Sequence, residues 1–463
     1  MSAPDLTAAM IDQLAQSGAE KHLTLLLGAG ASTSSGLPGW DELAIRLLLR
    51  SKSVDSREAA SLLVARQDPL LVAEAARKAP GANWNRSVKA ALYEGIDHLT
   101  PSALHIATAA HILDGNRNDT TLLTLNFDTL LEAAIQVGTQ QAVEARIGGQ
   151  PPADGYAVHH LHGIVTNEVV RGMVLTLSDF NELLGDSESW QLDLIRFAVR
   201  EGALLIAGTS YRDPDLRRWL HVALAEQPPE HATIVLLARQ GFELSRADFQ
   251  KVKKALADQW SAVGLSPIIL EDFTDAAQMI RELRHVHKDE YRSPQERSRF
   301  VWDAHASSFA TLQNAYSNQL VADAELLREA FNVDQLNVTF WLADAQGRLA
   351  RWAAQDRRYR ALDDLRLIDS GHDSRWVAGR ALGSEEILFQ DLDTDGIQRW
   401  STVLAAPIRV EHSGLPEFAT AVISVGLPGL AKDYEAAADD WLDTVLTIAN
   451  SWSTRLIAAC LSE

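Results

Sequence analysis

Cysteine is almost absent from this chain: Cys460 is the single one in 463 residues. One thiol cannot form an intramolecular disulfide, and it cannot supply a cysteine-rich zinc module. We therefore expect a protein held together by packing and hydrogen bonds, with no metal cofactor.

Long apolar runs are missing as well. No stretch approaches the roughly 20 uninterrupted apolar residues that a spanning helix needs. The first residues, MSAPDLTAAMIDQLAQ, lack the basic start and the apolar core of a signal peptide. The sequence predicts a cytoplasmic protein that does not engage a membrane.

Positive charge is scarce relative to negative charge. The chain has 42 Lys and Arg against 62 Asp and Glu, for a formal net charge of -20. A field of that sign repels phosphate backbones, so we do not expect nucleic acid as a partner. One small anionic ligand in a locally positive pocket remains compatible with this charge.

The length predicts more than one domain, because single cores rarely grow to 463 residues. A polar stretch, HKDEYRSPQERSR at 287–299, is a candidate boundary. We predict one domain over 1–290 and a second over 295–463.

The first domain alternates short apolar runs with helical patterns. Residues 41–118 are helical throughout, and the strand candidates are 22–27, 120–126, 157–163, 203–208, 233–238 and 266–270. Apolar strands that alternate with helices indicate a parallel sheet covered on both faces. The prediction is a Rossmann-like α/β domain with a helical insertion.

A glycine-rich turn, Gly28-Ala29-Gly30-Ala31-Ser32, follows the first strand. Such a turn lets backbone N–H groups approach a pyrophosphate at a helix start. Alone it is weak evidence, since a tight turn without a ligand has the same pattern.

Asn126 and Asp128 follow the second strand. Either side chain can cap the next helix, and for Asp128 alone capping is the favoured interpretation. Asn126 is harder to explain by structure, which makes it a candidate for chemistry.

Histidines end the third strand, at 159, 160 and 162. A lone histidine usually has a structural role, and the pattern does not separate His159 from His162; the glycine at 163 favours His162. Gly208-Thr209-Ser210 closes the fourth strand, and this turn either caps a helix or binds phosphate or ribose. Because all four clusters end strands of one sheet, they are predicted to meet where α/β sheets bind ligands.

The four clusters in this order resemble the sirtuin family, most closely the sirtuin-like NADase domains of bacterial anti-phage defence proteins. The motifs that carry the resemblance, over roughly residues 15–285, are GAGAS (28–32), SGLPGW (35–40), TLNFD (124–128), HG (162–163), GTS (208–210) and the longer TSYRDPDLRRWL (209–220).

The resemblance implies a role for each matching residue. His162 would be the general base, and Asn126 would bind the nicotinamide ribose or position the attacking water. Asp128 would hold the nicotinamide carboxamide. The remaining cofactor-binding residues would contact phosphates or the adenosine side of NAD: Gly28, Ala29, Gly30, Ser32, Gly208, Thr209 and Ser210.

The sequence also departs from the protein deacylases of that family. Those enzymes carry Asp-Phe-Arg after the proline of the first loop, whereas Pro38 is followed here by Gly39-Trp40-Asp41. The family's TQN is Thr124-Leu125-Asn126, and the four zinc-binding cysteines are missing. These differences count against lysine deacylation more than against NAD cleavage.

The leading hypothesis is an NAD glycohydrolase that yields nicotinamide and linear or cyclic ADP-ribose as a regulated effector of anti-phage defence by abortive infection. A base with a pKa near neutrality suits removal of a proton from water or a ribose hydroxyl. The alternatives are an NAD-dependent protein deacylase or ADP-ribosyltransferase, and a non-catalytic nucleotide sensor.

The second domain shows two hairpin-like strand pairs between long helices at 298–331 and 434–461. APIRV (406–410) and AVISVGLPG (421–429) are similar to GAF-type sensor domains. This resemblance implies control of the first domain by a small-molecule or protein activator, and the two long helices suit association into a homo-oligomer. Tryptophans at 341, 352, 376 and 400 would line a ligand pocket or, for most of them, pack in the core.

Overall fold

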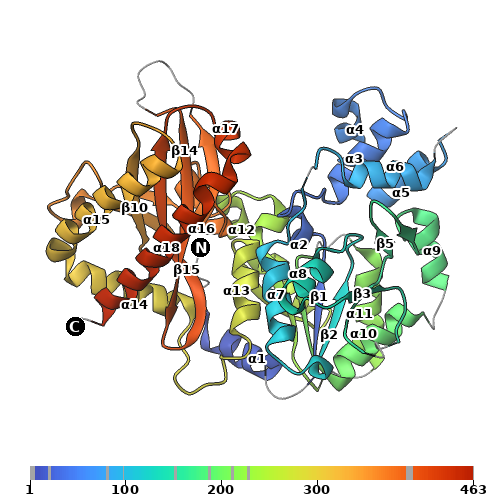
Figure 1. Ribbon diagram of the computed structural model, residues 1–463. Coiled ribbons are helices and arrows are strands. Elements are labelled where there is room, and N and C mark those ends of the chain that lie inside the picture. The colour runs from blue at the N-terminus through green and yellow to red at the C-terminus, as the bar shows by residue number, and fades with distance from the viewer. Residues whose placement is uncertain are drawn as a thin grey trace. The chain divides into compact units, whose positions relative to one another are not determined.

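The structure is a computed structural model. It describes residues 6–18, 22–79, 83–96, 98–150, 154–185, 189–209, 213–226, 230–392 and 400–461. The chain divides into two compact units (Figure 1). One holds Ala9–Ile269 and Met279–Arg284, and the other holds Met1–Ala8, Leu270–Gln278 and His285–Glu463.

A seven-stranded sheet in the order β3-β4-β2-β1-β7-β8-β9 forms the centre of the first unit. The pairs β1–β2, β1–β7, β2–β4, β3–β4 and β7–β8 are all parallel, which confirms the Rossmann-like fold. The strands are β1 His22–Leu27, β2 Thr120–Thr124, β3 Val143–Arg146, β4 Tyr156–His160, β7 Gly202–Ala207, β8 Thr233–Ala238 and β9 Ser266–Leu270.

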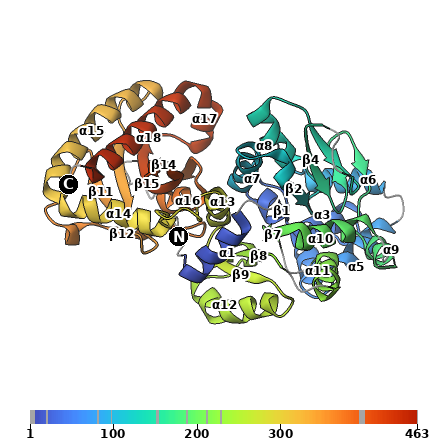
Figure 2. The same cartoon turned by 90° about the horizontal axis from the view of Figure 1, so that it is seen from below.

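Helices cover both faces of this sheet because its central strands are apolar on both sides. Leu26, Leu123 and Ile206 belong to one cluster that packs against α10 (Trp190–Glu201) and α11 (Pro214–Glu226). α7 (Ala103–Leu113) and α8 (Leu130–Thr139) lie on the other side of the strands (Figure 2). The remaining helices of the unit are α1 Ala8–Gly18, α2 Gly30–Thr33, α9 Leu177–Gly185, α12 Arg246–Ser261 and the end of α13 Phe273–Glu282.

The predicted helical insertion is present between β1 and β2. Its helices are α3 Trp40–Arg50, α4 Arg57–Val64, α5 Pro69–Arg77 and α6 Trp84–Leu92. Three of them begin at a side chain that accepts a backbone N–H, namely Ser56, Asp68 and Asn83. α3 and α6 share a core cluster with Phe127 and Leu130, so the insertion packs directly beside the end of β2.

The structure differs from the local predictions for this unit in three places. β4 ends at His160 rather than at 163, and the chain then turns through Gly163 at φ 89°. Residues 143–146 form the edge strand β3, which is not among the predicted strands. A short antiparallel pair, β5 Ile164–Val165 and β6 Val170–Arg171, was also missed.

The second unit contains a six-stranded antiparallel sheet in the order β12-β11-β10-β15-β14-β13. The two predicted strand pairs are β10–β11 and β14–β15. The strands are β10 Asn337–Ala343, β11 Arg348–Ala354, β12 Leu367–Asp369, β13 Leu388–Asp391, β14 Thr402–His412 and β15 Leu415–Leu427. Its helices are α14 Pro294–Ser307, α15 Phe309–Ala330, α16 Val377–Ser384, α17 Ala431–Ala436 and α18 Ala438–Cys460.

The predicted helix over 298–331 is in fact two helices, α14 and α15, which meet at Ser308. Just after this break Phe309 packs edge-on against Trp352, with ring centroids 5.2 Å apart. Trp341 and Trp352 are buried core residues, whereas Trp376 is exposed beneath the Arg366 guanidinium. Core packing is therefore the observed role of the first two. No helix in the described ranges is long and apolar enough to cross a membrane.

Candidate functional site

The turns after β1 and β7 lie against each other at the carboxyl edge of the parallel sheet. The Gly28 N–H donates to the Ala207 carbonyl at 2.9 Å, and the Gly30 N–H donates to the Gly208 carbonyl at 2.7 Å. These N–H groups, which were expected to approach a pyrophosphate, are thus already paired with backbone. The Ser32 N–H donates to the Ala29 carbonyl in the same way.

The two turns approach so closely that they require glycine. A Cβ on Gly28 would lie 2.7 Å from the Gly208 carbonyl oxygen, and a Cβ on Gly208 would lie 2.9 Å from the Ala31 nitrogen. Gly208 also has φ 68°, a conformation that favours glycine. Both glycines therefore have a structural reason that is independent of any ligand.

We expect Gly28→Ala to lower the free energy of unfolding by about 1–3 kcal/mol, because two backbone segments must separate to admit the methyl group. Thermal unfolding of the full-length protein measures this. Gly39→Ala is the matched control, since a Cβ there meets only Thr33 Cγ2 at 3.8 Å. Equal melting temperatures for the two variants would contradict the close approach.

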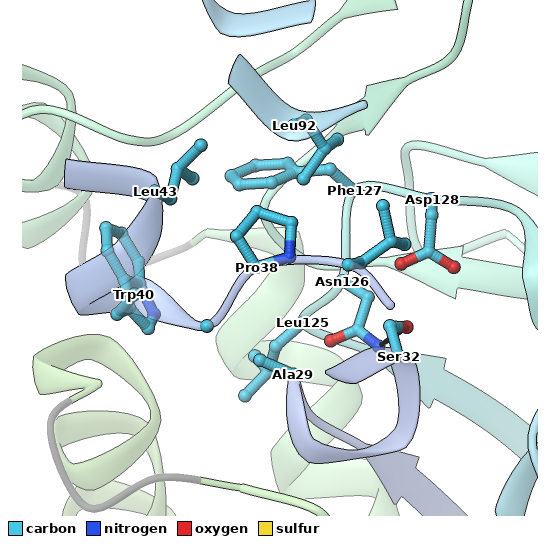
Figure 3. Close-up of a pocket in the computed structure, with 12 residues that line it drawn as sticks. Ala29, Ser32, Pro38, Trp40, Leu43, Leu92, Leu125, Asn126, Phe127 and Asp128 are labelled. Atoms are coloured by element: carbon cyan, nitrogen blue, oxygen red, sulfur yellow. Dashed lines mark hydrogen bonds between the residues drawn. The ribbon is translucent and has the colours of Figure 1, made fainter. Parts of the chain in front are cut away.

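A pocket opens beside these turns, between the end of β2 and the helical insertion. The empty space beside its lining atoms, with open solvent at the mouth included, is about 430 Å³. Figure 3 shows apolar side chains around Pro38 and the polar groups of Asn126, Asp128 and Ser32 together on one side, with Leu125 and Ala29 beside them. The lining residues are Ala29, Ser32, Leu37, Pro38, Gly39, Trp40, Leu43, Leu92, Leu125, Asn126, Phe127 and Asp128.

Asn126 is fixed at three of its four polar groups. Its backbone N–H donates to Thr124 Oγ1 at 3.0 Å, its carbonyl oxygen lies 2.9 Å from His160 Nδ1, and its amide Nδ2 donates to Ser32 Oγ at 2.8 Å. Among the described residues, no partner reaches Oδ1, although the side chain is buried. An unpaired buried acceptor at a pocket wall is an expected place for a ligand group.

Asp128 also lines the pocket, and it contacts the start of α8. Its Oδ1 accepts the Leu130 N–H at 3.1 Å, so it pairs the first N–H of α8 as a capping side chain does, although Thr129 holds the N-cap position. This hydrogen bond occupies one carboxylate oxygen and leaves the other available to a ligand. The structure thus brings Ala29, Ser32, Asn126 and Asp128 to one pocket.

His162 lies two residues beyond β4 and is not part of that pocket's wall. Its ring packs against Phe180 and Trp219, with centroids 5.4 and 5.8 Å away. Phe180 in turn lies beside Trp40, which lines the pocket, with ring centroids 6.4 Å apart. Both strand-end residues are buried: His162 is 1% exposed and Asn126 is 7% exposed.

Two buried carboxylates face the two ring nitrogens of His162. Nδ1 lies 3.5 Å from Asp213 Oδ2, and Nε2 lies 3.7 Å from Asp215 Oδ2. Burial lowers the pKa of His162, but the two carboxylates outweigh it and the pKa is raised. Burial also raises the pKa of Asp215, against the opposing effect of His162.

The neighbouring histidines differ sharply from each other. His159 Nδ1 faces the Gly148 carbonyl at 2.7 Å, and burial lowers its pKa. His160 is fully buried and links Glu132 to the Asn126 carbonyl.

Thr209 lies beside Gly28, and its Oγ1 has no partner in the described part of the chain. Ser210 lies outside the described residues.

Sequence reasoning missed Glu132, His160, Asp213 and Asp215. The motif at 209–220 contains both aspartates, and an acidic pair directly after the fourth strand was the signal that could have found them. No such signal existed for Glu132, which meets His160 only through the fold. Within the described ranges, no group of three or more His, Cys, Asp and Glu side chains is arranged so that it could hold a metal ion.

The SIR2-like domain family matches residues 120–268. The matched segment contains the clusters at 126–128, 162–163 and 208–210, and the glycine-rich turn at 28–32 precedes it. A SIR2-like domain is consistent with an NAD-utilising enzyme. No curated protein matches the chain.

One similar solved structure is described as a GAF sensor protein from Burkholderia vietnamiensis. It is 16% identical, with 31% of this chain and 92% of that chain covered, at a TM-score of 0.18. A TM-score this low supports no conclusion about the fold or function of either unit.

Proposed function

We propose that this protein is an NAD glycohydrolase that cleaves the bond between nicotinamide and ribose. The observation that carries the proposal is Asn126, whose Oδ1 is unpaired at a pocket with one apolar and one polar side. The apolar side suits an aromatic ring such as nicotinamide, and the polar side suits a carboxamide and ribose hydroxyls. The SIR2-like match over residues 120–268 supports the same cofactor.

Each polar residue of the pocket has a chemical task in this proposal. Asn126 Oδ1 accepts a hydrogen bond from a ribose hydroxyl or from the attacking water. Ser32 Oγ already accepts from Asn126, so its own proton is free to be donated to a phosphate oxygen. The second carboxylate oxygen of Asp128 accepts the carboxamide N–H of nicotinamide. Gly28 and Gly30 have N–H groups that are already paired with Ala207 and Gly208, so they hold the turn beside Ala29 rather than donate to a phosphate.

In the overall reaction, the oxygen of water bonds to the ribose carbon as nicotinamide leaves with the bonding electrons, and one proton is released. His162 accepts that proton in our proposal. Asp213 and Asp215 favour the charged ring, which stabilises the proton once it has been transferred. The ring lies behind Phe180, so transfer requires Phe180 to move or a water to relay the proton.

We further propose that NAD depletion serves anti-phage defence and that the second unit, as a GAF-like sensor, controls it. An unrestrained NAD hydrolase would kill its host, so activity must depend on a signal. To control the enzyme, the second unit must interact more strongly with one of its two states, active or inactive, than with the other. The difference in interaction free energy must be about 1–3 kcal/mol or more. Assembly into a homo-oligomer is the proposed two-state element.

The decisive experiment incubates full-length protein with NAD, with and without an acyl-lysine peptide, and separates the products. We expect nicotinamide and ADP-ribose, linear or cyclic, in equal amounts without peptide, formed at the basal rate of the protein before activation. Nicotinamide release only with peptide would instead establish a deacylase or transferase. Binding without release, together with unchanged NAD in phage-infected cells that express the protein, would establish a nucleotide sensor.

A further inference from the structure

We propose that His160 is a positioning residue: held by Glu132, it fixes the Asn126 backbone carbonyl and thereby aims the Asn126 side chain into the pocket. This inference rests on the proposed function, because Asn126 matters there through its free Oδ1. It assigns a role to a histidine that faces neither the pocket nor a ligand.

The geometry places three elements around one ring. His160 is the last residue of β4, and it pairs in register with Thr124 at the end of β2. Its Nδ1 lies 2.9 Å from the Asn126 carbonyl oxygen, and its Nε2 lies 2.6 Å from Glu132 Oε1 on α8. Ring, carboxylate and amide are all buried, so water does not compete for these contacts.

The hydrogen-bond partners of His160 determine which of its ring nitrogens carry a hydrogen. A backbone carbonyl only accepts, so Nδ1 must carry a hydrogen. At Nε2 there are two solutions: an ionised Glu132 accepts from a charged ring, or a protonated Glu132 donates to a neutral ring. Burial lowers the pKa of His160, but the combined effect of Glu132, the Asn126 carbonyl and Asp128 is larger, so the pKa is raised. This direction favours the charged ring, and the Nδ1–H is present in both solutions.

A simple packing role would not need this polarity. A buried ion pair is commonly no better for stability than well-packed apolar side chains of the same volume. What the pair adds is a fixed ring orientation, as carboxylate-anchored histidines supply in metal and catalytic sites. Here the oriented ring holds the peptide between Asn126 and Phe127, two residues that line the pocket.

The test uses the full-length protein and distinguishes the hydrogen bond at Nδ1 of His160 from the one at Nε2. Glu132→Gln removes the charge but keeps both hydrogen bonds, because the new amide donates to Nε2 of a neutral His160. In that background, His160→Asn places an amide N–H where Nδ1 was, and His160→Gln places one where Nε2 was. All three avoid an unpaired buried charge.

We expect kcat for nicotinamide release to stay within about 10-fold of wild type in Glu132→Gln and in the variant that adds His160→Asn. Adding His160→Gln instead should lower kcat by about 100-fold, because the Asn126 peptide is no longer held. Equal kcat values in the two double variants of similar melting temperature would overturn the proposal, since a structural role predicts equal losses.

A second readout does not depend on NAD cleavage. In protein labelled with ¹⁵N-histidine, the wild type and Glu132→Gln should show an exchange-protected imidazole Nδ1–H that is missing in both variants at His160. Its absence from the wild type would overturn the positioning role. If the wild type releases no nicotinamide, the proposed function fails while this NMR signal still tests the hydrogen bond to Asn126.

Discussion

His162→Gln is expected to slow nicotinamide release by about 10²–10⁴-fold, the usual contribution of one general base. Glutamine keeps much of the volume beside Phe180 and Trp219, but it cannot accept a proton at neutral pH. The kcat for nicotinamide release measures the effect. ADP-ribose binding, followed by calorimetry, shows whether the pocket is intact.

The same substitution will cost stability at pH values where His162 is charged, since Asp213 and Asp215 then lose the positive ring between them. Loss of one partner from a buried ion pair typically costs on the order of 3 kcal/mol. Kinetics should therefore be measured well below the melting temperature. His221→Gln is the matched control, because His221 lies exposed on α11. A wild-type rate in His162→Gln would remove His162 from the mechanism.

The raised pKa of His162 predicts opposite pH trends for activity and stability. A base must be neutral, so kcat/KM should rise with pH through the raised pKa, above 6.5. The ion pair stabilises the fold fully below the unfolded pKa of 6.5 and is lost as pH rises through the folded pKa. Over that range, activity should increase while the contribution of His162 to the free energy of unfolding decreases.

The strands that could be predicted are those whose residues are apolar on both faces, such as Leu25 and Leu26 in β1. β3 was missed because it is a half-exposed edge strand that contains Glu144 and Arg146. The break at Ser308 was missed for another reason. Helical patterns continue on both sides of it, and the change of direction goes with the packing of Phe309 against Trp352.

The site was predictable where sequence places polar residues at strand ends, and not where the fold supplies the partner. Asn126 and Ser32 were identified separately, and the structure joins them by one hydrogen bond across 94 residues of chain. The sequence assigned no role to His160. Its partner Glu132 lies 28 residues away in the chain and contacts it only because α8 packs against the sheet. The glycine-rich turn was expected to offer more N–H groups to a pyrophosphate than it does. The sequence cannot show that the Gly30 N–H is already paired with the Gly208 carbonyl.

Asn126→Ala is expected to lower kcat for nicotinamide release by about 10²–10³-fold, as loss of a preorganised polar group at a reacting centre does. The fold should tolerate it. Two of the three hydrogen bonds that fix this residue come from its backbone and survive in alanine. Only the bond to Ser32 is lost, for about 1 kcal/mol.

This combination, a large kinetic loss with a small change in melting temperature, distinguishes Asn126 from His162. Asn118→Ala is the matched control on the exposed turn before β2. Ser32→Ala supplies a second comparison: it breaks the same hydrogen bond but keeps the Asn126 amide and its Oδ1. It should therefore lose much less kcat than Asn126→Ala. If the two variants lose equal activity, the mutual hydrogen bond matters and the free oxygen does not, and the assignment of Oδ1 to the ribose or the water is wrong.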